Sequence, residues 1–343
     1  MGKKITLLVL GFLLLMAGCS KPKEVSTSFY LWKSILKKED VDRKYMEALH
    51  TQKLYFRFFD IDNKGNGAIP VGEIKKFEEL QFPAIPVVPV IFITNRTFEN
   101  ISQTELDTLA NRTVKKIDGL YNRIFKTFPS AYQFDCDWTA GTKENYFTFL
   151  RLIKKKRTAA HLSCTIRLHQ VKFYKKTGIP PVDRGVLMYY ASSEPTDFKA
   201  KNSILDNKEA SKYIQNMETY QLPLDIALPL YSWGIVQNTF GKIKLINGVR
   251  NSELKANPSL YKEEGENFYR VVEPHYLKGM WLNKDFKIKV EEVEESTLIE
   301  AAKTLKHKLN NDKIEIIFYH LDQEILKHYS TDKLQTILNI FSS

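Results

Sequence analysis

Acidic and aromatic residues stand at the ends of several short apolar runs in this 343-residue sequence. Carboxylates perform acid–base chemistry or accept hydrogen bonds from hydroxyl groups, and aromatic faces stack on sugar rings. Together these residue types indicate a carbohydrate site. The candidates for binding a sugar are Trp32, Asp60, Asp62, Asn95, Trp138, Arg167, His169, Tyr189, Tyr190, Tyr231, Trp233, Tyr319 and Asp322.

Three further carboxylates are candidates for catalysis: Asp135, Asp137 and Glu194. Asp135 and Asp137 lie two residues apart in a predicted strand, so both side chains are expected on one face and that of Cys136 on the other. Neighbouring carboxylates disfavour double ionisation, which raises the pKa of one of them and makes it a better acid. The alternative is that Asp135 and Asp137 form a hydrogen-bonded brace with no catalytic role.

Extended apolar runs alternate with amphipathic helical patterns after residue 28. Runs that are apolar almost throughout are typical of parallel strands covered on both faces. Regular βα alternation predicts an α/β fold, a (β/α)8 TIM barrel with functional groups at the carboxyl ends of its strands. The competing arrangement is an open doubly wound sheet, but no glycine-rich phosphate loop follows the first strand. Strands are expected at 29–35, 54–61, 85–93, 132–138, 162–168, 185–190, 224–231 and 314–319, and helices at 40–50, 72–80, 104–128, 143–156, 208–218, 296–309 and 332–341.

The interval between the seventh and eighth strands is too long for a simple connection. Short runs at 268–272, 279–282 and 286–290 predict a small antiparallel insertion over about residues 238–292. Its aromatic residues either form one wall of a groove or fill the insertion's own core. We expect at least one of them to face the barrel mouth: Tyr261, Phe268, Tyr269, Tyr276 or Trp281.

The N-terminus has the pattern of an export signal. Lys3 and Lys4 precede an apolar run over 5–16, which is too short to span a bilayer comfortably. The run ends in Leu15-Met16-Ala17-Gly18-Cys19, which resembles the bacterial lipobox. The alternative is an ordinary signal peptide or short anchor with an incidental cysteine.

The lipobox resemblance implies that Cys19 is lipidated and becomes the mature N-terminus. It divides the chain into a lipoprotein signal peptide over 1–18, a lipidated tether over 19–28 and a barrel over 29–343. Because Ser20 and Lys21 follow the cysteine instead of an aspartate, it also implies sorting to the outer membrane of a bacterial cell envelope. The lipid would then hold a monomeric protein at the membrane.

The distribution of charge and the spacing of possible metal ligands argue against nucleic acid, cofactor and metal partners. The net charge of +11 is spread along the chain without a basic stripe interleaved with aromatic residues, so no nucleic acid partner is expected. No cofactor or metal is expected either, because the seven histidines show no close ligand spacing; His169 and His320 are of interest only as strand ends. The segment 62–73 overlaps an EF-hand loop, but Lys64 stands where an oxygen ligand belongs, which favours a chance turn.

Two cysteines, Cys136 and Cys164, lie inside predicted core strands. An exported protein can form disulfides, but a buried cysteine also behaves as a small hydrophobic residue. We favour free thiols over a disulfide.

Short motifs at four strand ends resemble family 18 glycoside hydrolases, the chitinases and endo-N-acetylglucosaminidases. The segment 134–138, Phe-Asp-Cys-Asp-Trp, is similar to the end of that family's fourth strand, Asp-x-x-Asp-x-Asp-x-Glu. In the right order, 29–32 resembles its first strand, 187–190 its sixth-strand Met-x-Tyr-Asp and 227–231 its seventh-strand Gly-x-Pro-x-Tyr. The resemblance spans the barrel and implies that the protein acts on or binds glycan.

Three positions depart from the family pattern. Thr139 stands where the family has its general acid glutamate, Tyr132 where it has the first aspartate, and Tyr190 where it has the sixth-strand aspartate. A threonine hydroxyl is far too weak an acid to protonate a glycosidic oxygen. Three functions therefore stay open: a hydrolase with another acid, a catalytically inactive carbohydrate-binding barrel, and a partner-binding surface lipoprotein.

Overall fold

The computed structural model describes residues 22–33, 35–36, 42–65, 67–74 and 84–342. The predicted signal peptide, Cys19 and most of the helix expected over 72–80 lie outside these residues. None of the helices in the described ranges is long and apolar enough to cross a membrane.

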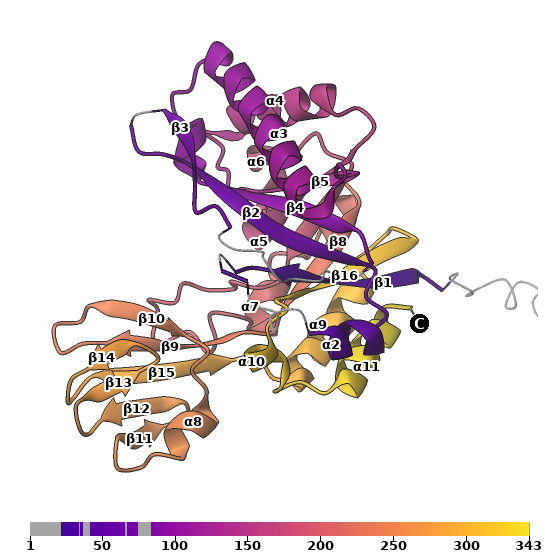
Figure 1. Ribbon diagram of the computed structural model, residues 1–343. Coiled ribbons are helices and arrows are strands. Elements are labelled where there is room, and N and C mark those ends of the chain that lie inside the picture. Colours follow the sequence, from indigo (N-terminus) through magenta and orange to yellow (C-terminus); the bar gives the residue numbers. More distant parts are fainter. Residues whose placement is uncertain (1–21, 34, 37–41, 66, 75–83, 343) are drawn as a thin grey trace, which may run out of the picture.

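Eight parallel strands close into a barrel with helices between them, which confirms the predicted α/β (β/α)8 fold (Figure 1). The pairing of the first strand with both the second and the last closes the sheet on itself. A short strand, β3 (Ala68–Val71), pairs with the end of the second strand and forms an antiparallel hairpin with it. The barrel strands in chain order are β1 (Glu24–Leu31), β2 (Lys53–Asn63), β4 (Val87–Ile93), β5 (Ala131–Asp135), β6 (His161–Arg167), β7 (Arg184–Met188), β8 (Leu224–Pro229) and β16 (Lys313–Tyr319).

Of the predicted helices that lie within the described residues, all but one form, and several short helices that were not predicted join them. The longest of the described helices begins at a capping box: Glu105 N donates to Ser102 Oγ, and Ser102 N donates to Glu105 Oε2 at 2.8 Å. The helix expected over 208–218 is instead one short helix and a 3-10 turn, although Ala210, Ile214 and Met217 are still buried. The helices are α2 (Arg43–Ala48), α3 (Gln103–Phe125), α4 (Lys143–Lys156), α5 (Leu168–Lys172), α6 (Tyr174–Thr177), α7 (Asn207–Ser211), α8 (Asn251–Lys255), α9 (Glu295–Lys306), α10 (Gln323–Leu326) and α11 (Thr331–Ser342), with 3-10 turns η2 (Asn95–Phe98) and η3 (Met217–Thr219).

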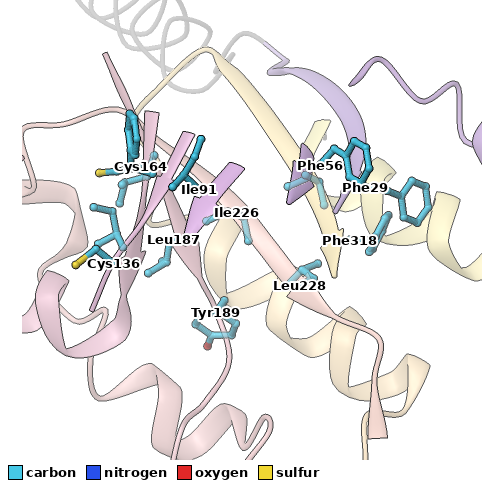
Figure 2. Packing of buried hydrophobic residues seen from close by; sticks show 14 of the residues in the cluster. Phe29, Phe56, Ile91, Cys136, Cys164, Leu187, Tyr189, Ile226, Leu228 and Phe318 are labelled. Atoms are coloured by element: carbon cyan, nitrogen blue, oxygen red, sulfur yellow. The ribbon is translucent and has the colours of Figure 1, made fainter. Parts of the chain in front are cut away.

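Barrel strands bury side chains on both faces, as apolar parallel strands require. Outward-facing residues such as Phe29, Ile91 and Ile226 form the main core between strands and helices (Figure 2). Cys136 and Cys164 belong to this core as free thiols, which confirms the expectation that they do not pair. The inward-facing residues form a second cluster that fills the barrel: Tyr30, Tyr55, Val88, Val90, Val186, Met188, Tyr190, Ala227 and Ile317.

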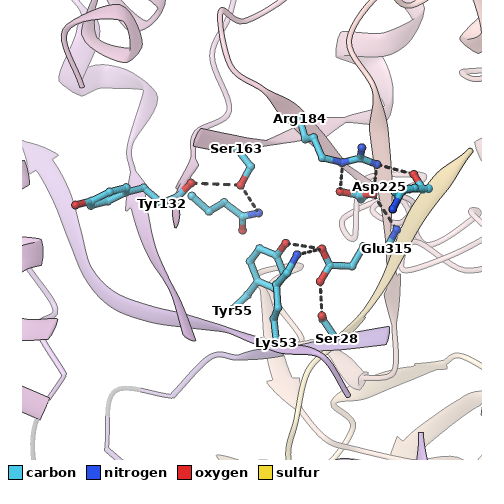
Figure 3. Close-up of polar contacts among 10 residues, drawn as sticks. Ser28, Lys53, Tyr55, Tyr132, Ser163, Arg184, Asp225 and Glu315 are labelled. Carbon is cyan, nitrogen blue, oxygen red and sulfur yellow. Dashed lines mark hydrogen bonds and ion pairs between the residues drawn. The ribbon is translucent and has the colours of Figure 1, made fainter. Parts of the chain in front are cut away.

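A buried polar network occupies the barrel near the amino ends of its strands (Figure 3). Glu315 Oε2 accepts hydrogen bonds from Tyr55 Oη at 2.9 Å and Lys53 Nζ at 2.8 Å. Asp225 accepts two bonds from Arg184, at 2.7 and 2.6 Å, and one from the backbone N of Glu315 at 2.8 Å. Because each buried carboxylate has several donors, the network packs this end of the barrel without an uncompensated charge.

An antiparallel sheet lies between the seventh and eighth barrel strands and extends away from the barrel (Figure 1), as predicted. Its strand order is β10-β9-β15-β12-β11, and a hairpin of two short strands adds to its core. The sheet begins at Ser232 instead of about residue 238, because β8 ends at Pro229 and the chain re-enters a strand at once. Its strands are β9 (Ser232–Gln237), β10 (Ile243–Asn247), β11 (Tyr261–Gly265), β12 (Phe268–Val271) and β15 (Lys287–Glu292), with the hairpin β13 (His275–Leu277) and β14 (Met280–Leu282).

Candidate functional site

A pocket of about 430 Å³ opens at the carboxyl end of the barrel. Barrel strands contribute its floor, and the first two strands of the insertion contribute part of one wall. Eight of the residues predicted from the sequence line this pocket: Trp32, Asp60, Asp135, Arg167, Tyr190, Tyr231, Trp233 and Tyr319.

Five of these residues form a continuous aromatic surface. Tyr319, at the end of β16, has its ring 5.8 Å from Tyr190, 5.7 Å from Tyr231 and 5.8 Å from Trp32, centroid to centroid. Trp233 extends the surface, with its ring 5.4 Å from Tyr231. Aromatic faces of this kind bind the apolar C–H faces of sugar rings while their polar tips take hydrogen bonds.

Asp135 supplies a buried carboxyl beside this aromatic surface. It ends β5 with 4% of its surface exposed and accepts a hydrogen bond from Thr165 Oγ1 at 2.6 Å. Burial raises its pKa, and nearby Asp137 raises it further, whereas Arg167 at 3.9 Å opposes the shift. Arg167 also donates two hydrogen bonds to Asp137, which is exposed and lies outside the pocket lining.

Arg57 and Asp60 form the second charged pair of the pocket. Arg57 Nε donates to Asp60 Oδ1 at 2.8 Å, and a second bond joins Nη2 to Oδ2. Residues three apart on a regular strand point to opposite faces, but the register of β2 against β4 shifts between Arg57 and Phe59. This bulge lets both side chains reach the pocket, where the Arg57 guanidinium lies 5.6 Å from the Trp32 ring centroid.

Two predicted site residues belong to the hydrophobic core instead of the pocket, because their side chains point outward from the barrel. Trp138 is fully buried, stacks on Tyr146 at 5.3 Å and donates to the Thr177 carbonyl. Tyr189 is also fully buried, on the outward face of its segment (Figure 2). Tyr189 comes directly after β7 and has the opposite parity to Met188 and Tyr190, which line the pocket. Trp138 lies three residues beyond the end of β5 and packs on Tyr146 of α4.

Other predicted residues stabilise loops outside the pocket. Asp62 accepts hydrogen bonds from Arg96 and Thr94, which hold the pKa of its carboxyl well below its usual range. Asp322 caps α10 and pairs with a lysine at 2.7 Å. The remaining predicted residues also lie outside the pocket lining. Asn95 accepts a hydrogen bond from Thr142, and the side chains of His169 and Glu194 are exposed.

The pocket also contains residues that the sequence analysis did not select. Arg57 carried a usable signal, since it and Asp60 are the charged residues of a predicted strand whose other members are apolar or aromatic. Asn247 and Gly248 carried none, because they enter the pocket only through the pairing of β10 with β9. The lining residues not selected as binding candidates are Arg57, Phe92, Met188, Ser232, Asn247, Gly248, His320 and Ile325.

The aromatic residues expected to bring the insertion to the barrel mouth lie elsewhere. Tyr261 and Tyr269 are buried in the insertion's own core, and Tyr276 and Trp281 pack edge to face in the exposed hairpin, with ring centroids 4.9 Å apart. None of the five, Phe268 included, is among the described residues that line the pocket, so that prediction is wrong. The insertion reaches the mouth through Ser232, Trp233, Asn247 and Gly248 instead.

No family model matches this sequence, and no curated protein is similar to it. Solved structures are similar. The spore cortex-lytic enzyme SleL from Bacillus cereus superposes with a TM-score of 0.55 at 12% identity, covering 95% of this chain and 76% of the other. A chitinase from Chromobacterium violaceum gives 0.52 at 11% identity (91% and 98% covered), and the C-terminal domain of a putative chitinase from Desulfitobacterium hafniense gives 0.55 at 10% (94% and 100%).

The chain has the fold of these chitinase-like glycoside hydrolases. The fold implied by the resemblance of four short motifs is therefore confirmed. A chitinase domain from Ostrinia furnacalis in complex with a chitooligosaccharide has the same fold, with a TM-score of 0.52 at 10% identity over 92% of this chain and 95% of that one. Thr139, at the position of the family's acid, is exposed outside the pocket lining, and its backbone N donates to Thr142 Oγ1 at 3.0 Å.

Proposed function

We propose that the barrel-mouth pocket binds a glycan without cleaving it. The observation that carries this proposal is the continuous aromatic surface of Trp32, Tyr319, Tyr231 and Trp233 beside two acidic acceptors. Aromatic faces supply stacking area, and carboxylates accept hydrogen bonds from sugar hydroxyls. The complex of a similarly folded chitinase domain with a chitooligosaccharide supports oligomers of N-acetylglucosamine as the first ligands to test.

The acid–base groups favour binding over hydrolysis. Both carboxylates that line the pocket lie beside an arginine: Asp60 accepts hydrogen bonds from Arg57, and Asp135 lies 3.9 Å from Arg167. Thr139 supplies no acid. The side chains therefore suit recognition of hydroxyl groups better than protonation of a leaving oxygen.

Binding is tested on a glycan array, followed by calorimetry with the pentamer of N-acetylglucosamine, using the chain without residues 1–19. Trp233→Ala should weaken binding, because it removes part of the aromatic wall. Trp281→Ala is the matched control, since this tryptophan is 47% exposed in the insertion hairpin and lies outside the pocket lining. Equal loss of affinity in both variants, or no glycan bound by the unsubstituted protein, would refute the proposal.

Hydrolysis with Asp135 as the acid is the second candidate. It is favoured by one observation: burial raises the pKa of Asp135, which keeps a larger fraction of the carboxyl protonated. If the protein releases sugar from β-linked oligosaccharides and Asp135→Asn slows that release about 10²-fold or more, the hydrolase is the correct function. Turnover that survives in both Asp135→Asn and Asp137→Asn would place the chemistry elsewhere.

We further propose that Cys19 carries a lipid that holds a monomeric protein at the bacterial outer membrane. The support is the sequence around Cys19, together with the position of Glu24, which begins β1 at the amino end of the barrel. Five residues span at most about 17 Å, so the tether would hold the amino end near the bilayer and leave the pocket facing away from it. Cys19→Ala should leave the protein unprocessed or release it from the membrane fraction; correct processing and membrane retention of that variant would contradict the assignment.

A further inference from the structure

Glu291 is a charged side chain of the insertion with only 2% of its surface exposed. Its Oε2 accepts a hydrogen bond from the indole Nε1 of Trp233 at 2.9 Å and one from the backbone N of Ser203 at 3.0 Å. The Ser203 hydroxyl donates to the same oxygen. Oε1 lies 2.6 Å from Lys289 Nζ. One carboxylate therefore joins β9, β15 and the segment that follows β7.

Trp233 is the member of this group that lines the pocket. Its position in β9 pairs directly with that of Glu291 in the antiparallel strand β15, so the two side chains share one face of the sheet. An indole has a single hydrogen-bond donor, and here Glu291 accepts it. The ring of Trp233 also contacts that of Tyr231. The bond to Glu291 and this contact together restrict rotation of the indole about its side-chain torsions.

The charge of Glu291 is compensated within the same group. Lys289 is also 2% exposed, donates to the Ala200 carbonyl and lies 6.0 Å from the ring centroid of Phe268. A buried ion pair of this kind contributes little net stability, because desolvation offsets the attraction. What it provides is a fixed acceptor at one place in the sheet.

We propose that Glu291 is a positioning residue that holds the indole of Trp233 in the orientation in which it forms the pocket wall. Glu291 is outside the pocket lining, so it acts through Trp233 and touches no ligand. The inference rests on the proposed glycan binding only for its effect on affinity. The orientation of the indole is a property of the unliganded protein.

The experiment follows the indole N–H signals by ¹⁵N–¹H NMR in the full mature chain. The chain contains four tryptophans, and the Trp233 signal is assigned by its loss in Trp233→Phe. In Glu291→Gln the Trp233 signal should shift and exchange faster with water, while those of Trp138 and Trp281 stay in place. The affinity for the N-acetylglucosamine pentamer should fall about threefold to tenfold, the scale of one uncharged hydrogen bond.

A double-mutant cycle separates positioning from a direct role. Glu291→Gln should not lower affinity further in a Trp233→Phe background, because the group through which it acts is already changed. An unmoved Trp233 signal, or an equal loss of affinity in both backgrounds, would overturn the proposal. If Glu291→Gln does not fold, Glu291→Asp keeps the charge beside Lys289, withdraws the acceptor and should give the same shift. Failure of the unsubstituted protein to bind the pentamer would refute glycan binding, while the NMR shift alone would still decide the positioning role.

Discussion

Replacing Asp135 by asparagine tests whether the charge of this buried carboxyl stabilises the barrel or instead costs stability and serves the pocket. Asparagine has the same shape and can still accept the hydrogen bond from Thr165 Oγ1. What it loses is the charge facing Arg167. At 3.9 Å that attraction is about 4 kcal/mol for an effective dielectric constant near 20.

Desolvation of the carboxylate and repulsion from Asp137 oppose this attraction, and together they outweigh it. Moving a carboxylate into a protein interior costs several kcal/mol, about the same size as the attraction to Arg167, and Asp137 adds repulsion. The net result is a folded-state pKa above the unfolded value of 3.8. The contribution of Asp135 to stability is therefore fully present below pH 3.8 and is lost as the pH rises through the folded-state pKa.

The uncharged variant avoids that loss. Asp135→Asn should unfold with the same or a higher free energy at pH 7, and the two proteins should converge below pH 3.8. Urea denaturation at a series of pH values measures both quantities. If the ion pair is a brace, the variant is instead about 1–3 kcal/mol less stable at pH 7, with the gap closing in acid. That outcome would refute the reasoning and remove Asp135 from the candidate site.

Three other changes have expected outcomes. Glu315→Ala should lower the unfolding free energy by about 3 kcal/mol in urea denaturation, because it leaves buried Tyr55 Oη without its acceptor. Asp62→Asn should lower the melting temperature at pH 7; since hydrogen bonds lower the pKa of Asp62, that gap should close as the pH falls below 3.8, and a gap independent of pH would contradict the pairing with Arg96. Burial raises the thiol pKa of Cys136 and Cys164, so iodoacetamide should modify them only at the rate of unfolding, and fast labelling of the native protein would contradict their placement.

The barrel could be predicted because its strands are buried on both faces. Such strands give continuous apolar runs, and eight of them separated by helical patterns fit few other topologies. Strand ends were less certain: β5 ends at Asp135, three residues before the predicted end at 138. Residues beyond a strand end leave the alternation, which explains why Asp137 is exposed although it has the same parity as Asp135.

Site residues could be predicted only where the sequence indicated both the face of the strand on which the side chain lies and the point at which the strand ends. Tyr319 ends β16 and lines the pocket, and Tyr190 lines it from two residues beyond the end of β7. Tyr189, of the opposite parity, joins the core, as does Trp138, which lies three residues beyond the end of β5. Arg57 depends on a bulge, and a bulge follows from the pairing of two strands instead of the sequence of one. The same holds for the insertion, where register between distant strands brings its residues to the pocket.

The three departures from the glycoside hydrolase pattern are consistent with one another in the structure. Tyr132, in place of one aspartate, donates from its hydroxyl to Asp118 at 2.9 Å within the core. Tyr190, in place of another, packs against the Tyr319 ring and forms pocket floor. Thr139, in place of the acid, closes a turn with Thr142. Of the three residues only Tyr190 lines the pocket, where its ring adds to the aromatic surface; Tyr132 packs in the core and Thr139 lies outside the pocket lining. Under the proposed function, these departures keep the aromatic faces that would hold a sugar ring and lack the glutamate that would protonate its glycosidic oxygen.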